Sequence, residues 1–203
     1  MVLCTSGAYR YGISEKILVG EKGICSNSGK ETPEVLFAFL YTTGPYPLSY
    51  NGWGDVLVII FFGFVPVGGT YYVQALTWTP DVTVASLVCG LLIDTLLVVN
   101  NYRDREADAR SGKQTIIVRF GEKFGRYFYL ALGITASLLC LRFLSEGHFY
   151  AGLLPQLYLI PHFFTWKKMV RIYNGKKLNN ILGETSRNML LMGVLLSLGL
   201  LLG

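Results

Sequence analysis

A row of acidic and amide side chains lies on one side of a predicted helix. Asn100, Asp104 and Asp108 follow one another at intervals of four residues, and Asn101 falls within the same arc of about 120°. Because carboxylates one helical turn apart repel each other, a row of this kind needs a compensating charge. Mg²⁺ supplies one, since it binds a few carboxylate oxygens together with the phosphate oxygens of a substrate. The spacing therefore predicts a magnesium ion held by Asp104 and Asp108.

Basic side chains accompany this row along the chain. They are Arg103, Arg105, Arg110, Lys113 and Arg119. Arginine binds phosphate oxygens through a two-pronged fork, and lysine binds them as a point charge. Together with the metal, these cations predict a site for a diphosphate group. The alternative interpretation is a solvated helix end whose mixed charges neutralise one another, as is common where membrane helices reach the cytoplasm.

Polar residues inside the apolar part of the chain favour a site over a solvated helix end. Asn100 and Asn101 lie within the predicted membrane boundary, and Asp94 lies nearly two turns deeper. Polar groups inside a membrane are costly, and by default they face the interior of a helical bundle. For Asp94, support of the site and a contact between helices both remain open.

The chain that carries these residues is too apolar for an ordinary soluble domain. Of its 203 residues, 52% are hydrophobic and 15% are charged. The apolar residues form runs of about 20, the length at which a helix crosses a bilayer, whereas a sixth run at 35–41 is too short. The predicted spans are 55–74, 82–101, 127–144, 150–166 and 188–203. The expected fold class is an all-α polytopic transmembrane helical bundle, which excludes a cytosolic enzyme, a disordered tail and a disulfide-stapled secreted module.

The basic residues predict how the spans are oriented. Seven of the 18 Lys and Arg residues lie at 103–126 and six at 167–187, whereas the connections at 75–81 and 145–149 contain none. Basic connections stay on the cytoplasmic side of a membrane. We therefore expect a multi-pass protein of the cell membrane whose aspartate row faces the cytoplasm. The net charge of +5 then reflects topology and attraction to the lipid bilayer, and no nucleic-acid binding is expected.

The start of the chain differs in composition from the rest. Residues 1–34 contain four Glu and no Asp, and we expect them to be a polar leader, disordered or foreign to the membrane domain at 35–203. Cys4 and Cys25 lie in this leader, and Cys89 and Cys140 lie in predicted spans. Since the amino terminus is expected in the cytoplasm, all four cysteines are expected to be free thiols.

Two stretches resemble one family of membrane enzymes. Residues 100–121 follow the pattern Asn-Asn-x-Arg-Asp-x-x-x-Asp-x-x-x-Gly-Lys-x-Thr-x-x-Val-Arg-x-Gly, which is similar to the second aspartate-rich motif of the UbiA superfamily of membrane prenyltransferases. The Asn-Asn-x-Arg-Asp form resembles the 1,4-dihydroxy-2-naphthoate polyprenyltransferases of menaquinone synthesis. Residues 41–54 resemble the Tyr-x-x-Gly-Pro-x-Pro-x-x-Tyr-x-Gly-x-Gly stretch of the same subgroup. The likeness extends from about residue 39 to the carboxyl end.

The resemblance implies a nine-span bundle in which a polyprenyl diphosphate meets 1,4-dihydroxy-2-naphthoate, with Mg²⁺ as cofactor, to give demethylmenaquinone. It implies catalytic roles for Asn100, Asp104 and Asp108, and diphosphate binding by Asn101, Arg103, Lys113 and Arg119. Tyr46, Tyr50, Tyr71 and Tyr72 are the aromatic residues expected to face the cation-like carbon of the prenyl chain. The alternatives are a prenyltransferase for another aromatic acceptor, of the ubiquinone type, and a non-enzymatic membrane transporter or scaffold.

The chain departs from the family pattern at its front. The family has two aspartate-rich motifs and nine spans, whereas this sequence has one such motif and five or six spans. Losing one preorganised electrostatic group costs an enzyme on the order of 10²- to 10³-fold in rate. We therefore expect this polypeptide alone to be an inactive or weakly active fragment.

Overall fold

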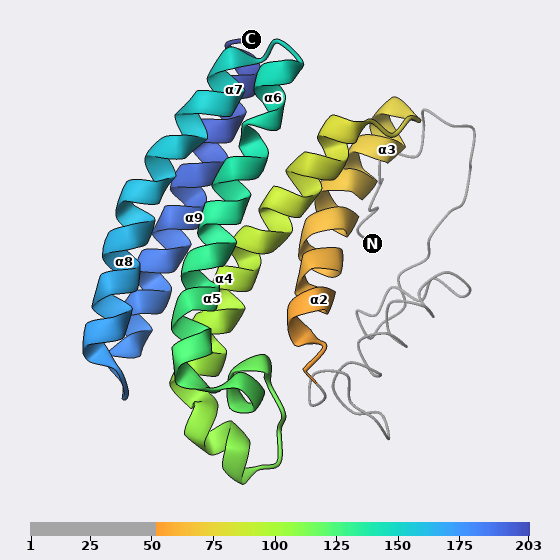
Figure 1. Ribbon diagram of the computed structural model, residues 1–203. Coiled ribbons are helices and arrows are strands. Elements are labelled where there is room, and N and C mark those ends of the chain that lie inside the picture. Colours follow the sequence, from red (N-terminus) through yellow and green to blue (C-terminus); the bar gives the residue numbers. More distant parts are fainter. Residues whose placement is uncertain (1–51) are drawn as a thin grey trace, which may run out of the picture. The chain divides into compact units, whose positions relative to one another are not determined.

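The computed structural model describes residues 52–203, and every regular element in that range is a helix. The elements are α2 (Gly54–Val58), η3 (Ile59–Gly69), α3 (Thr70–Ala75), α4 (Pro80–Arg110), α5 (Ile116–Cys140), α6 (Arg142–Ser145), α7 (Phe149–Leu153), η4 (Leu154–Tyr158), α8 (Leu159–Ile172) and α9 (Leu178–Leu201). Figure 1 shows them as a bundle of long helices. The all-α prediction is confirmed. The predicted leader at 1–34 and the short apolar run at 35–41 lie outside the described residues.

Three helices in the described range are long and apolar enough to cross a membrane. They cover Gly54–Ala75, Pro80–Arg110 and Ile116–Ser145. They contain the first three spans predicted from the sequence. The other two predicted spans are also helical, since 150–166 falls in α7, η4 and α8 and 188–203 falls largely in α9.

The first span packs against α4 through glycines. Its middle part, η3, is a π-helix of 11 residues, a rare form that usually lasts a single turn. A Cβ on Gly63 would lie 2.4 Å from the backbone oxygen of Ser86, and a Cβ on Gly90 would lie 2.9 Å from the backbone of Ile59. Small residues of this kind let two membrane helices approach backbone to backbone. The first span and α4 therefore form a tight antiparallel hairpin.

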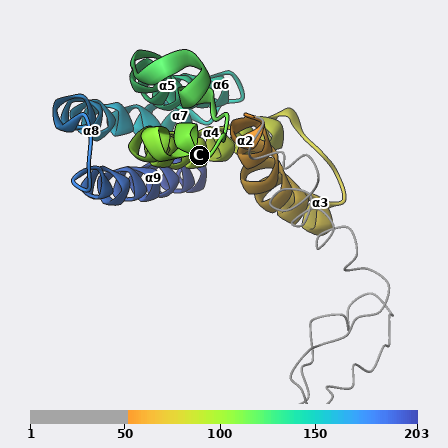
Figure 2. The same ribbon diagram turned by 90° about the horizontal axis from the view of Figure 1, so that it is seen from below.

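Helix α4 lies at the centre of the described bundle. Figure 2 shows it between α5 and α9, with α2 on a third side. Its apolar side chains Val98, Val99 and Tyr102 are fully buried. Polar contacts also join the outer helices, since Tyr129 on α5 and Thr185 on α9 lie 3.0 Å apart through their hydroxyl oxygens. Helix α4 thus has few ways to shift without disturbing its neighbours.

The polar connections predicted at 103–126 and 167–187 are mostly helical, which corrects the sequence-based boundaries. Helix α4 continues to Arg110, and α9 begins at Leu178, ten residues before the predicted span. Thr115 starts α5, because its side-chain oxygen accepts a hydrogen bond from the Val118 nitrogen. Hydropathy marks where a helix leaves the apolar layer, but the backbone hydrogen bonds of a helix continue beyond that point.

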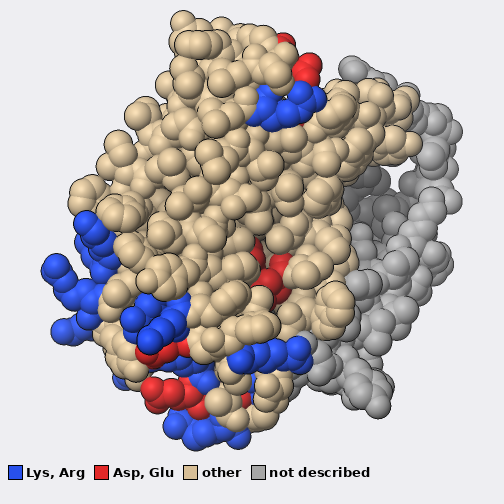
Figure 3. Space-filling view, viewed as in Figure 1, with Lys and Arg blue, Asp and Glu red and all other residues tan. Residues whose placement is uncertain are grey.

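Charged side chains gather at one end of the described bundle. Figure 3 shows most Lys and Arg atoms at the lower end, where α4 finishes and α5 begins. Near the opposite end, Arg142 and Glu146 form an ion pair of 2.7 Å. The charge asymmetry expected from the sequence is therefore present in this part of the chain.

Candidate functional site

The last turns of α4 carry the predicted aspartate row. Asn101 is buried, and Asn100, Asp104 and Asp108 are half-buried on the same helix. Helix α2 begins beside Leu97, since a Cβ on Gly54 would lie 3.6 Å from a Leu97 methyl group. The row thus continues along α4 past the level at which the first span starts.

Asp104 is bound by its neighbour in the chain. Arg103 donates a hydrogen bond of 2.8 Å from Nε to Oδ1 of Asp104 and one of 2.5 Å from Nη2 to Oδ2. Its third nitrogen, Nη1, donates to Oδ1 of Asn179 on α9, at 2.9 Å. Asn179 lies in the first turn of α9, 76 residues after Arg103 in the chain. The structure makes it the contact that orients Arg103.

Asp108 pairs with the second predicted cation. Lys113 Nζ lies 3.5 Å from Oδ2 of Asp108, and the Lys113 backbone nitrogen donates to the Asp108 carbonyl oxygen at 2.9 Å. The turn between them contains Gly112, whose φ of +78° is a backbone conformation that favours glycine. Oδ2 of Asp108 is buried and has no hydrogen-bond partner among the described residues. An acceptor atom of this kind is available to a bound cation.

Arg119 reaches the same end of the bundle from α5. A Cβ on Gly52, just before α2, would lie 3.5 Å from Cζ of Arg119 and 3.0 Å from the carbonyl oxygen of Gln114. Gly52 has a φ of +79°, so a side chain there would be both strained and crowded. The structure therefore gathers α4, the start of α5 and the residues before α2 into one region, as the predicted site requires.

Arg105, one of the cations predicted to contact phosphate, contacts other protein groups in the described structure. It lies 3.5 Å from Glu122, which Arg126 also contacts at 3.3 Å. The Arg105 guanidinium stacks over the rings of Tyr102 and Tyr173, with Cζ 4.6 Å and 5.1 Å from their centroids. In the sequence, the only sign of these contacts is the four-residue spacing of Glu122 and Arg126. Arg105 links α4 to α5 in the structure.

The structure does not bring the predicted aromatic residues to the aspartate row. Tyr71 and Tyr72 are exposed on α3, at the end of the hairpin where α4 begins. Asp104 lies about 36 Å from Pro80 along the axis of α4. These two rings therefore cannot face a carbon bonded to a diphosphate held at Asp104, which corrects that prediction. Tyr46 and Tyr50 lie outside the described residues.

The residues of the row fit a magnesium ion that binds together with a substrate. In the part of the chain that the structure describes, no three His, Cys, Asp or Glu side chains are grouped to hold a metal. Mg²⁺ commonly takes one or two carboxylates and completes its shell with water and substrate phosphates. Asp104 and Asp108 meet that requirement, since among the described residues Oδ2 of Asp108 accepts no hydrogen bond and faces only the Lys113 ammonium group, at 3.5 Å.

A carboxyl pair that the sequence did not predict lies deeper on the same helix. Asp94 has no exposed surface, and its carboxyl group interacts with that of Asp55 on α2, which is 6% exposed. The position of Asp55, an acidic residue at the beginning of an apolar span, was the only signal of this pair in the sequence besides Asp94 itself. For Asp94, the structure shows a contact between helices.

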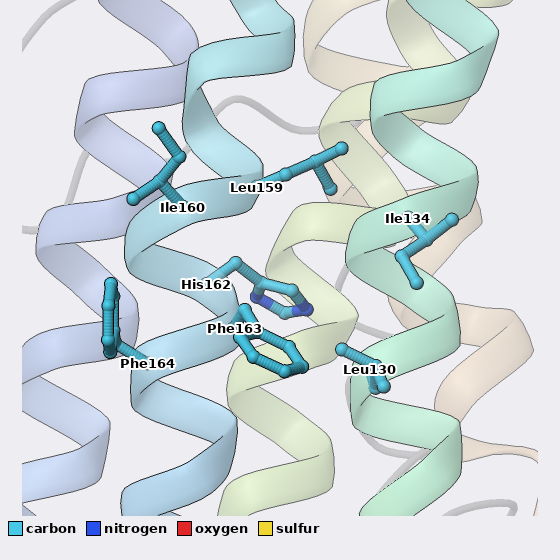
Figure 4. A pocket seen from close by; sticks show the side chains of 7 residues that line it. All are labelled: Leu130, Ile134, Leu159, Ile160, His162, Phe163 and Phe164. Atoms are coloured by element: carbon cyan, nitrogen blue, oxygen red, sulfur yellow. The ribbon is translucent and has the colours of Figure 1, made fainter.

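A separate apolar pocket of about 400 Å³ lies between α5 and α8. Figure 4 shows its lining side chains, of which His162 alone is polar. His162 is buried, lies 2.9 Å from the hydroxyl of Tyr158 through Nδ1, and stacks on Tyr129. These contacts indicate a structural role for this histidine.

Several known proteins resemble the chain. The sequence profile of the UbiA prenyltransferase family matches residues 34–182. The 1,4-dihydroxy-2-naphthoate octaprenyltransferase of Haemophilus influenzae is 33% identical, over 98% of this chain and 64% of its own length. Proteins of the same name from Escherichia coli and Mycobacterium leprae are 35% and 41% identical, over 70% and 50% of this chain and 44% and 35% of their own lengths. No solved structure matches the chain.

The matches cover different shares of the relatives and of this chain. The chain spans between about a third and just under two thirds of the length of these three relatives. The family profile, by contrast, covers most of the chain and includes the whole row on α4 with Lys113 and Arg119. This chain belongs to the UbiA prenyltransferase family.

Proposed function

We propose that this chain carries the diphosphate-binding helix of a membrane enzyme that transfers a polyprenyl chain from polyprenyl diphosphate to 1,4-dihydroxy-2-naphthoate. The products are diphosphate, CO₂ from the carboxyl group of the acceptor, and the reduced (quinol) form of demethylmenaquinone. The observation that carries the proposal is the placement of Asp104 and Asp108 one turn apart beside Arg103 and Lys113. The names of the relatives support this acceptor and do not favour a ubiquinone-type acceptor, a transporter or a scaffold.

The ion pairs at the site suggest how a substrate is taken up. Without ligand, Arg103 neutralises Asp104 and Lys113 neutralises Asp108. Asp104 and Asp108 would hold Mg²⁺, which when bound would stabilise negative charge on the leaving diphosphate. The side chains of Arg103 and Lys113 then exchange their carboxylate partners for phosphate oxygens. Asn100 and Asn101 provide amide groups on the membrane side of the site. The apolar helices exclude water from the reactive carbon of the prenyl chain.

The orientation in the membrane is part of the proposal. The Lys and Arg atoms that gather at the end of α4 support a cytoplasmic position for the aspartate row in the cell membrane. A cytoplasmic site would give access to a water-soluble aromatic acid and to the diphosphate head group. The prenyl tail would extend into the bilayer.

Binding of the prenyl donor tests the proposal without requiring turnover. The full chain is purified into lipid nanodiscs, and octaprenyl diphosphate is titrated with and without Mg²⁺. We expect Mg²⁺-dependent binding that the double variant Asp104→Asn, Asp108→Asn weakens at least tenfold. Glu106→Gln is the matched control, because Glu106 is an exposed acid on the same turns whose carboxylate accepts a hydrogen bond from Asn174 at 2.8 Å.

Two results would overturn the proposal. One is binding of the donor that does not depend on Mg²⁺, and the other is equal binding by the double variant and Glu106→Gln. Adding 1,4-dihydroxy-2-naphthoate to the same samples and analysing the lipid extract for demethylmenaquinone tests the choice of acceptor.

A further inference from the structure

Two buried carboxyl groups meet inside the hairpin formed by the first span and α4. Asp94 has no exposed surface and Asp55 is 6% exposed. Both oxygens of Asp94 and Oδ1 of Asp55 are buried without a hydrogen-bond partner. A Cβ on Gly54, the neighbour of Asp55, would lie 3.6 Å from Leu97, about one turn beyond Asp94, so the two carboxyl groups lie at nearly the same height of the hairpin and repel each other when both are charged. Among the described residues, no Lys, Arg or His forms an ion pair with either group. The pair is therefore an acidic site inside the apolar layer without a compensating cation.

Burial of this pair lowers the stability of the fold. The glycine contacts of Gly63 and Gly90 hold η3, which directly follows α2, against α4, so the beginning of the first span stays beside the part of α4 that carries Asp94. A buried polar group without a partner destabilises a fold by about 1–3 kcal/mol, and a charged one by more. Ionisable groups within membrane spans usually serve a function for this reason.

The position of the pair relates it to the proposed donor site. Asp94 and Asn101 lie on the same side of α4, about 10 Å apart along the helix axis. The pair therefore lies on the membrane side of the row that ends in Asp104 and Asp108. Figure 3 shows acidic atoms within the apolar surface, well above the charged lower end. Asn101 and Asp94 are 6% and 0% exposed, so an aromatic molecule that reaches both polar groups has to enter between the helices that cover them.

We propose that the Asp55–Asp94 pair accepts the proton of a phenolic hydroxyl group of the aromatic acceptor. This inference rests on the proposed function. The O–H bond of the acceptor breaks, its proton moves to a carboxylate oxygen of the pair, and the electron pair stays on the phenolate oxygen. The electron-rich ring then bonds to the prenyl carbon, whose bond to oxygen breaks as the diphosphate leaves with that electron pair.

The chemistry of the pair favours uptake of a proton over binding of a metal ion. Two neighbouring carboxyl groups in a medium of low dielectric constant hold one negative charge between them better than two. Such a pair both accepts a hydrogen bond and stores a proton. A divalent cation would need a third protein ligand or several water molecules, and the described residues provide no third acidic, His or Cys side chain at this place.

The absorption spectrum of the bound acceptor tests the proposal directly. A phenol and its phenolate absorb at different wavelengths, so the ionised fraction of 1,4-dihydroxy-2-naphthoate can be measured in nanodiscs under argon. We expect the native chain to bind it largely as the phenolate. Asp94→Asn and Asp55→Asn should lower the ionised fraction at least tenfold. Asp94→Glu should restore part of it, because it keeps a carboxylate there.

Asp81→Asn is the matched control, since Asp81 lies on α4 at its opposite end and also has a buried carboxyl oxygen without a partner. It should bind the acceptor as the native chain does. The proposal is wrong if the native chain and Asp94→Asn give the same spectrum, or if the native chain does not bind the acceptor. Mg²⁺-dependent binding of the prenyl donor is measured on the same samples. If the donor binds but either negative result is obtained with the acceptor, the proton-acceptor proposal fails while the proposed function stands. A thermal melt of each variant shows that it is folded.

Discussion

The guanidinium group of Arg103 holds the carboxylate of Asp104 through two hydrogen bonds, at 2.8 Å and 2.5 Å. Both residues remain partly exposed, with 27% and 44% of their side-chain surfaces accessible, so the pair can open at little cost. The aspartate that is expected to bind metal is thus covered by the cation that is expected to bind phosphate. Uptake of a magnesium diphosphate would satisfy both groups at once.

Removing Arg103 should therefore have opposite effects on two ligands. In Arg103→Ala, Mg²⁺ alone should bind about two- to five-fold more tightly, because an exposed ion pair that competes for Asp104 is worth only about 0.5–1 kcal/mol. Octaprenyl diphosphate with Mg²⁺ should bind at least tenfold more weakly, because a charge-assisted hydrogen bond to phosphate is lost. Calorimetric titration in nanodiscs measures both. A parallel loss of both affinities would show that Arg103 only supports the local fold.

The buried carboxyl pair should limit the stability of the membrane domain. In Asp94→Asn, the new amide can donate a hydrogen bond to Asp55, and the interaction between two acidic groups disappears. We expect the free energy of unfolding to rise by about 1–2 kcal/mol. Unfolding in SDS, followed by circular dichroism, measures the change, with the native chain as reference. A decrease in stability would show that Asp94 has a favourable partner in the native state.

The glycine contacts of the hairpin should be sensitive to a single methyl group. Gly63→Ala places a Cβ 2.4 Å from the Ser86 backbone oxygen, which can move only with its helix. Overpacking of this kind costs about 1–3 kcal/mol. In Gly69→Ala, the control in the same π-helix, the new Cβ has nothing within 4 Å. Thermal melts in detergent should show a lower Tm for Gly63→Ala alone; equal melts would mean that the hairpin is looser than described.

Labelling of introduced cysteines should show the orientation of the bundle. In a background with the four native cysteines replaced by Ala, Glu106→Cys lies at the end of α4 that carries the aspartate row, and Glu146→Cys lies near the opposite end. We expect a membrane-impermeant maleimide to label Glu146→Cys in intact cells and to label Glu106→Cys only in inverted vesicles. The reverse pattern would place the aspartate row outside the cell.

Several features of the site followed from the sequence because they depend on residues close together in the chain. The four-residue spacing of Asp104 and Asp108 gives their common side once the segment is helical, and hydropathy gives the spans. The interaction of Arg105 with Glu122 did not follow, because it depends on how α5 turns back after Gly112. The large separation between Tyr72 and the aspartate row did not follow either, because it depends on the antiparallel course of the hairpin.

Composition, helical period and charge are local properties, so a membrane-spanning helical chain with an acidic row at the basic end of one helix can be predicted without coordinates. The contact of Asn179 with Arg103 and the approach of Asp55 to Asp94 follow from the packing of the helices. These contacts join residues on different helices. Their formation depends on which faces pack together, and at the hairpin that choice is made by the close approach of Gly63 and Gly90.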